Sequence, residues 1–119
     1  MSDHNDLDER LLEYGARAIK LVESLPNTLV GRRIGDQLLR SATSVGANYE
    51  EAQGAESKSD FVHNLQLSLK ELRESLYWLR LLAKAGTFPL ERLTDIIDEA
   101  TQLRVILSKA VATAKGKAK

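Results

Sequence analysis

Residues 57–86, SKSDFVHNLQLSLKELRESLYWLRLLAKAG, decide the fold of this 119-residue chain. Ser57 and Asp60 have the spacing of a capping box, in which a hydroxyl precedes a carboxylate by three residues. Apolar residues then recur every three or four positions, as on one face of an α-helix. They are Phe61, Leu65, Leu69, Leu72, Leu76, Leu79 and Ala83. Gly86 follows as a typical helix stop, so the stretch predicts a helix over about residues 59–85.

Three further segments show the same period, and they span about residues 6–25, 29–55 and 89–112. Pro26-Asn27 ends the first segment, Gly54 lies near the end of the second, and Pro89 suits a first helical turn. Short connections make neighbouring helices antiparallel. The sequence therefore predicts an all-α protein, with residues 1–119 forming a single domain that is an antiparallel up-down-up-down four-helix bundle.

The composition excludes several classes of protein. Lysine plus arginine number 17, aspartate plus glutamate also 17, and there is no cysteine. The chain therefore has no disulfide, thiol nucleophile or cysteine-ligated metal. No apolar stretch approaches the roughly 20 residues that a membrane span needs, and residues 1–6 lack the pattern of a signal peptide. We expect a cytoplasmic protein that does not bind membranes.

The residues give no support for catalysis. His4 and His63 are the only histidines, and neither has the glutamate three residues earlier that di-iron bundles use. Phosphate-binding loops, nucleophile elbows and dinucleotide fingerprints are absent from the sequence. We therefore expect no enzymatic activity, no catalytic residues, no metal and no cofactor.

A polar line runs along the helix expected over residues 29–55, at the edge of its apolar stripe. Its polar members are Gln37, Ser41, Ser44, Asn48 and Glu51. Glu71 lies on a similar line of the following helix. Half-buried polar groups need hydrogen-bond partners. These residues therefore form either a network between helices or subunits, or an ordinary polar boundary of a bundle.

The helix expected over residues 59–85 has more apolar residues than one face can hold. The excess predicts an oligomer interface. The candidate interface residues are Leu76, Tyr77, Trp78, Leu81 and Leu82. In the alternative interpretation, the four helices of one chain bury most of this surface.

Two groups of basic residues are candidates for nucleic-acid contacts. The first is Arg32, Arg33 and Arg40, and the second is Lys115, Lys117 and Lys119. A ring would repeat each group and hold a phosphate backbone without a basic monomer. The alternatives are a solvated helix end and a solubilising tail, with Arg40 paired to Asp36 one turn earlier.

The sequence resembles the four-helix bundle proteins first noticed as reading frames in intervening sequences of bacterial 23S rRNA genes. The resemblance lies in residues 37–52 (QLLRSATSVGANYEEA), 56–61 (ESKSDF) and 70–79 (KELRESLYWL), and extends over about residues 8–112. It implies a four-helix bundle that assembles into rings, usually homopentamers, without enzymatic activity.

Accessory proteins of diversity-generating retroelements form a related branch, whose basic barrels bind nucleic acid and a reverse transcriptase. The present chain departs from that branch in its zero net charge. We therefore expect a homo-oligomeric scaffold or adaptor that binds a protein partner. The alternative is an accessory protein that binds RNA or DNA through arginine and lysine clusters repeated around a ring.

Overall fold

The structure, a computed structural model, describes residues 3–116 and is all-α over that range, with no strand. Four long helices follow one another along the chain. They are α1 (Asp3–Glu23), α2 (Leu29–Gln53), α3 (Lys58–Ala85) and α4 (Thr94–Ala114). A 3₁₀ turn, η1 (Leu90–Arg92), precedes α4. The expected all-α class with four helices is confirmed.

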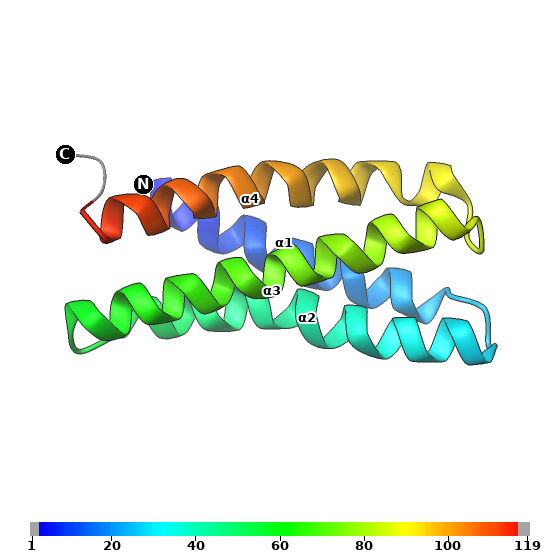
Figure 1. Cartoon of the computed structure of the whole chain (residues 1–119), viewed down its shortest axis with the longest axis horizontal. Helices are drawn as coiled ribbons and strands as arrows, with labels where there is room; N and C mark the ends of the chain where they lie inside the picture. The colour runs from blue at the N-terminus through cyan, green and yellow to red at the C-terminus, as the bar shows by residue number, and fades with distance from the viewer. Residues whose placement is uncertain (1–2, 117–119) are drawn as a thin grey trace.

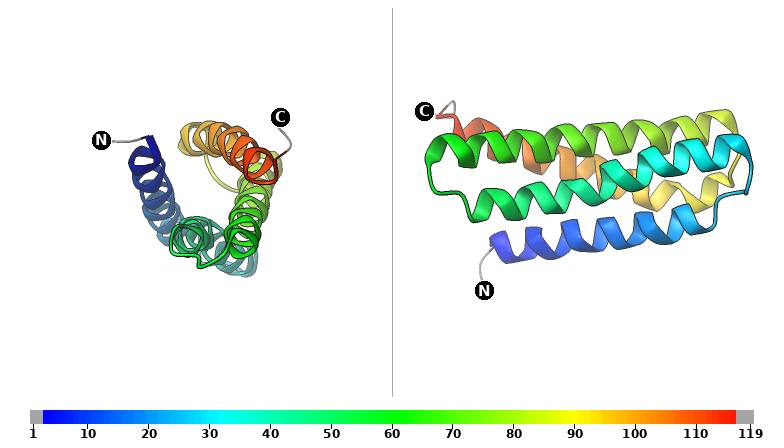
Figure 2. Two further views of the ribbon diagram at one scale, coloured as in Figure 1. Left: turned by 90° about the vertical axis from the view of Figure 1, so that its left-hand side faces the viewer. Right: turned by 90° about the horizontal axis from the view of Figure 1, so that it is seen from below.

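The helices form an elongated antiparallel bundle with extents of 46 × 26 × 21 Å (Figure 1). Seen along its axis, the bundle places α1, α2, α3 and α4 in order around its circumference (Figure 2). Both ends of the chain lie at the same end of the bundle. Because of this order of the helices, the face formed by α1 and α2 is opposite the face formed by α3 and α4.

Local sequence signals set most helix ends. The Ser57 side chain accepts a hydrogen bond from the Asp60 backbone N–H at 3.0 Å, and Thr28 caps Gly31 in the same way. Gly86 ends α3 with a φ of 71°, in the left-handed region that favours glycine. These two ends of α3 follow the sequence prediction closely.

The fourth helix begins later than the sequence predicts. Pro89 precedes η1 instead of opening a helix, and α4 starts at Thr94. Phe88 and Leu93 on either side of this turn are both buried. The chain therefore turns tightly here to direct two large apolar side chains into the core before α4 begins.

Each helix contributes one apolar stripe to a continuous core. Leu38, Leu72 and Leu103 are fully buried, and each such leucine contributes about 1.5–3 kcal/mol by leaving water. Tyr14 is the largest fully buried side chain, although the sequence pattern does not mark it. Ile19 of α1 is 41% exposed and faces a groove between α1 and α2.

Two of the three buried serines, Ser68 and Ser75, take part in hydrogen bonds between helices. The Tyr14 hydroxyl lies 2.7 Å from Ser75 Oγ on α3, and Ser75 donates to the Leu72 carbonyl at 2.9 Å. Ser68 on α3 donates to the Val45 carbonyl of α2 at 2.7 Å. Such bonds fix the relative positions of the helices, because an unpaired buried hydroxyl costs about 1–3 kcal/mol.

Stability should fall in alkaline solution because of Tyr14. Burial raises the pKa of Tyr14 to about 12, with the bond to Ser75 partly opposing the rise. An unfolded tyrosine ionises near pH 10, so unfolding becomes easier as the pH rises from about 10 to 12. We expect a loss of about 2–3 kcal/mol over this window in urea unfolding. Tyr14→Phe should make the decline shallower, whereas Tyr77→Phe at an exposed site should not; equal slopes would contradict this assignment.

Candidate functional site

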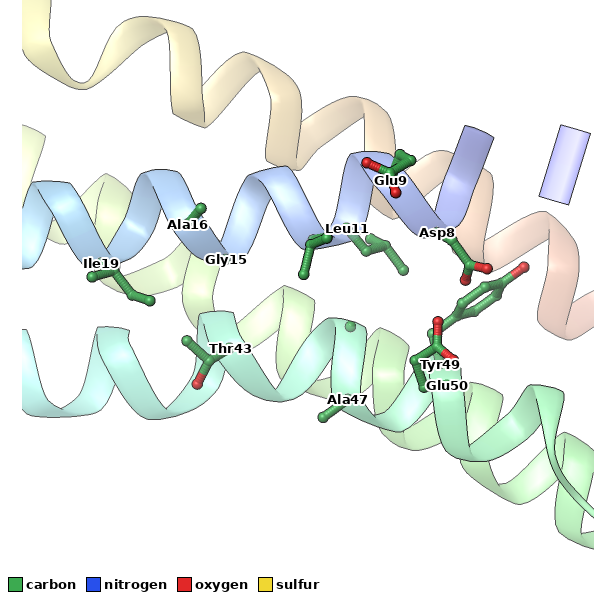
Figure 3. A pocket seen from close by; sticks show the side chains of 12 residues that line it. Asp8, Glu9, Leu11, Gly15, Ala16, Ile19, Thr43, Ala47, Tyr49 and Glu50 are labelled. Carbon is green, nitrogen blue, oxygen red and sulfur yellow. The ribbon is translucent and has the colours of Figure 1, made fainter. Parts of the chain in front are cut away.

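A groove of about 510 Å³ lies between α1 and α2 on the outside of the bundle (Figure 3). We call it the α1/α2 groove. Its lining residues are Asp8, Glu9, Leu11, Leu12, Gly15, Ala16 and Ile19 of α1 and Thr43, Gly46, Ala47, Tyr49 and Glu50 of α2. Leu12 is 67% exposed, which is unusual for a large apolar side chain beside other apolar groups. The groove therefore presents apolar surface from two helices to solvent.

The small residues of the groove are not required by packing within the chain. A Cβ at Gly46 would lie 3.6 Å from Leu11 Cβ, and one at Gly15 would lie 3.9 Å from the α2 backbone. Both distances are ordinary contacts. Each glycine inside a helix nevertheless costs about 0.5–1 kcal/mol relative to alanine. By contrast, a Cβ at Gly31 would lie 2.1 Å from the Pro26 carbonyl oxygen, so that glycine is needed for the α1–α2 turn.

Acidic side chains border one end of the groove. Asp8, Glu9 and Glu50 are its charged residues within the described part of the chain. Figure 3 shows the Asp8 carboxylate of α1 pointing toward the Tyr49 ring of α2. Burial raises the pKa of Tyr49, and the charges of Asp8 and Glu50 raise it further. Asp8 Oδ1 is buried with no hydrogen-bond partner among residues 3–116, and such an acceptor favours an incoming donor.

The polar line of α2 makes mostly local bonds. The hydroxyls of Ser41 and Ser44 and the amide of Asn48 donate to backbone carbonyls one turn earlier in α2. Only Ser41 is buried, while Asn48 is half-buried and Glu51 is exposed. The side chains of Gln37 and Glu71 meet through Arg40 rather than through the serines.

Arg40 is the centre of the polar contacts between α2 and α3. It donates to Glu71 at 3.1 Å and to Gln37 at 3.2 Å, and it also pairs with Glu74. Glu74 in turn accepts from Trp78 Nε1 at 3.0 Å. The sequence offered Asp36 as an alternative partner of Arg40, but in the structure Arg40 pairs with Glu71 and Glu74 of α3 instead. Arg40 is therefore a structural link, which weakens its candidacy as a nucleic-acid contact.

The candidate interface residues of α3 divide into two groups. Leu76 and Leu82 are buried in the core of the single chain, so their assignment to an exposed interface is wrong. Trp78 and Leu81 are half-buried, and Tyr77 is 57% exposed. The four helices of one chain thus absorb much of the apolar excess of α3, because the α2 and α4 sides of this helix are both covered.

The candidate nucleic-acid residues do not form one surface. Arg32 and Arg33 are exposed at the start of α2, and Lys115 is exposed after α4. These positions lie at opposite ends of the bundle (Figure 1). Arg32 also donates to the Asn27 side chain at 3.0 Å. Lys117 and Lys119 lie outside the described residues.

A row of exposed cations on α3 escaped the sequence reasoning. Lys70, Arg73, Arg80 and Lys84 are all exposed and recur with helical spacing around Tyr77. We call these five residues the α3 cationic row. Tyr77, Arg80 and Lys84 also line a shallow groove of about 590 Å³ that reaches Ile97 of α4. The sequence contains this row as an i, i+3, i+7, i+10, i+14 spacing, which places the five residues on one face of a helix. The many leucines of the same helix drew attention to its apolar side instead.

The described residues contain no group of three or more histidine, aspartate or glutamate side chains placed to hold a metal ion. No described helix is long and apolar enough to cross a bilayer.

Arg10 and Glu99 form a bidentate pair between α1 and α4 at 2.9 and 3.0 Å, and this pair raises the pKa of Arg10. This pair joins α1 to α4.

The two glycines of α2 should respond oppositely to alanine. Gly46→Ala should raise the stability of the folded single chain by about 0.5–1 kcal/mol, because it improves helix propensity without a clash. Gly31→Ala should lower it by roughly 1–3 kcal/mol, because the new methyl overlaps the Pro26 carbonyl. Urea unfolding followed by circular dichroism, in dilute solution, measures both. Destabilisation by Gly46→Ala would show that packing within the chain requires this glycine.

Comparisons with known proteins agree with the fold. A family model described as "23S rRNA-intervening sequence protein" matches residues 8–109. A solved structure from Bacteroides thetaiotaomicron, a protein of unknown function from the S23 ribosomal protein family, is 34% identical to this chain. The match covers 87% of this chain and 96% of that one, with a TM-score of 0.81. A search of curated proteins finds no match.

Proposed function

The chain belongs to the family of 23S rRNA-intervening sequence proteins, and for this member we propose a non-enzymatic, self-associating scaffold that binds protein surfaces. Neither the family description nor the solved relative supplies an activity. The proposal rests on one observation, the exposed apolar α1/α2 groove. The homo-oligomer, with a pentameric ring implied by the resemblance, and a protein partner both belong to this proposal.

Several properties of the groove support a protein ligand. Its length follows two helices, and its floor combines leucine and isoleucine with small residues. Helices pack closely against such surfaces, because small side chains admit a neighbouring ridge. The uncovered Leu12 and Ile19 would gain about 25 cal/mol for each Å² of apolar surface removed from water.

Two exposed leucines provide a matched test of self-association. Leu12→Lys in the groove should lower the molar mass of the native particle, because an ammonium group placed in an apolar contact loses its hydration. Leu90→Lys, at a leucine that is 57% exposed outside the groove, should leave the mass unchanged. Light scattering coupled to size exclusion measures both variants, and circular dichroism checks their helical content. Equal masses for wild type and Leu12→Lys would remove the groove from the interface. Leu76→Asp is unsuitable, because Leu76 is buried and its replacement should unfold the chain.

The α3 cationic row favours nucleic-acid binding as a second candidate function. Four exposed cations along one helix, with a tyrosine between them, suit a phosphate backbone and a stacked base. The chain as a whole has zero net charge, but its charges are unevenly distributed, so a local basic surface can still attract a phosphate backbone.

This second function has a separate test. Fluorescence anisotropy with a 20-nucleotide single-stranded RNA at about 50 mM salt should show binding that weakens steeply as salt increases. Arg73→Gln combined with Arg80→Gln should reduce the affinity and the salt dependence, whereas Arg33→Gln should change neither. Absence of binding by the wild type at low salt would eliminate the nucleic-acid function.

A further inference from the structure

We infer that the α1/α2 groove of one chain receives the α3 cationic row of a second copy, so that copies join head to tail. This inference rests on the self-association proposed above and adds which two surfaces meet. The surface that the groove binds is then the α3 cationic row of another copy of the same chain.

The positions of the two surfaces determine the type of contact. The groove lies on the α1–α2 face, and the α3 cationic row lies on the opposite side of the bundle, toward α4 (Figure 2). A contact between two different surfaces is heterologous, and each copy keeps one surface available for the next. Repetition of such a contact gives a closed ring or an open filament rather than an isolated two-fold dimer.

Charge complementarity selects the α3 cationic row as the occupant. Every charged side chain that lines the groove within the described residues is acidic. The charged residues of the shallow groove between α3 and α4 are Arg80 and Lys84. The row adds Arg73 about two turns and Lys70 about three turns before Arg80. Surfaces of opposite charge orient the approach of two molecules and disfavour contact between two identical surfaces.

The groove contains features that the single chain leaves unused. Asp8 Oδ1 is buried and lacks a hydrogen-bond partner among the described residues, and rotation of this half-buried side chain toward the groove lets an arginine or lysine of the row supply the missing donor. Gly15 and Gly46 keep the floor low although a Cβ would fit at both. Tyr77 is the large exposed aromatic residue of the row, and aromatic side chains are favoured as anchors in protein interfaces.

The size of the bundle is sufficient for this contact. A stable interface removes roughly 800 Å² from each partner. Each long face of this bundle is 46 Å long and more than 20 Å across. One face therefore provides the required area without any rearrangement of the helices.

Cysteine cross-linking tests the inference cleanly, because the natural chain has no cysteine. Ala47→Cys places a thiol in the groove, and Tyr77→Cys places one in the row; both positions are exposed. After the two single variants are mixed and allowed to exchange subunits, a short bismaleimide should join them into a covalent heterodimer. Each variant alone should give little cross-linked product. Glu13→Cys serves as the control partner for Tyr77→Cys and should not react with it, because Glu13 is exposed outside the groove, three residues after Arg10, which pairs with Glu99 of α4.

Charge reversal gives an independent measurement. Arg73→Glu with Arg80→Glu should reduce the native mass to that of one chain at micromolar concentration, whereas Arg33→Glu with Lys115→Glu should leave the wild-type mass. A wild-type oligomer that fails to cross-link residue 47 to residue 77, or that links residue 47 to itself, overturns the inference but leaves self-association intact. A monomeric wild type overturns both. Wild-type monomers that bind RNA through the row would assign the row to nucleic acid and overturn the inference as well.

Discussion

The absence of large side chains where α1 crosses α2 is the constraint on which this account depends. Gly15, Gly46 and Ala47 keep the outer surface of this helix pair low, so Leu12 and Ile19 remain in contact with solvent. A chain selected only for its own stability would gain from alanine at both glycines, because neither position is sterically closed. The hollow therefore carries a cost in stability, which the proposed binding of a second copy would offset.

The remainder of the bundle holds this hollow in place. α2 is fixed to α3 by the buried Ser68–Val45 bond and by the pairs of Arg40 with Glu71 and Glu74. α1 is fixed by the buried contact of Tyr14 with Ser75 and by the pair of Arg10 with Glu99. Surface ion pairs contribute little stability individually, but these bonds define how the helices are rotated and which sides they expose. A preformed surface loses less conformational entropy on binding.

Much of the fold was predictable because it follows from local signals and a 3.6-residue period. The Ser57 cap, the Gly86 stop and the leucine stripe of α3 each act within a few residues. The later start of α4 was not predictable in this way, because it depends on Phe88 and Leu93 entering a core made by other helices. Tyr14 was missed for the same reason, since its burial depends on a serine 61 positions away.

The site was less predictable, because periodicity does not say how much of a helix its neighbours cover. Leu76 and Leu82 pointed to an interface in the sequence, yet the chain buries both within itself. The acidic groove, and its position opposite the α3 cationic row, require the order of helices around the bundle, which separates the charges onto opposite faces although their sum is zero. Glu74 as a partner of Arg40 likewise required the register between α2 and α3.

The molar mass of the native wild-type particle tests the central claim most directly. Light scattering across the micromolar range should give a multiple of the 13.2 kDa chain mass, with dissociation only on dilution or at high salt. A particle of 13.2 kDa at every concentration would show that the α1/α2 groove does not join copies of this chain, and would contradict the account.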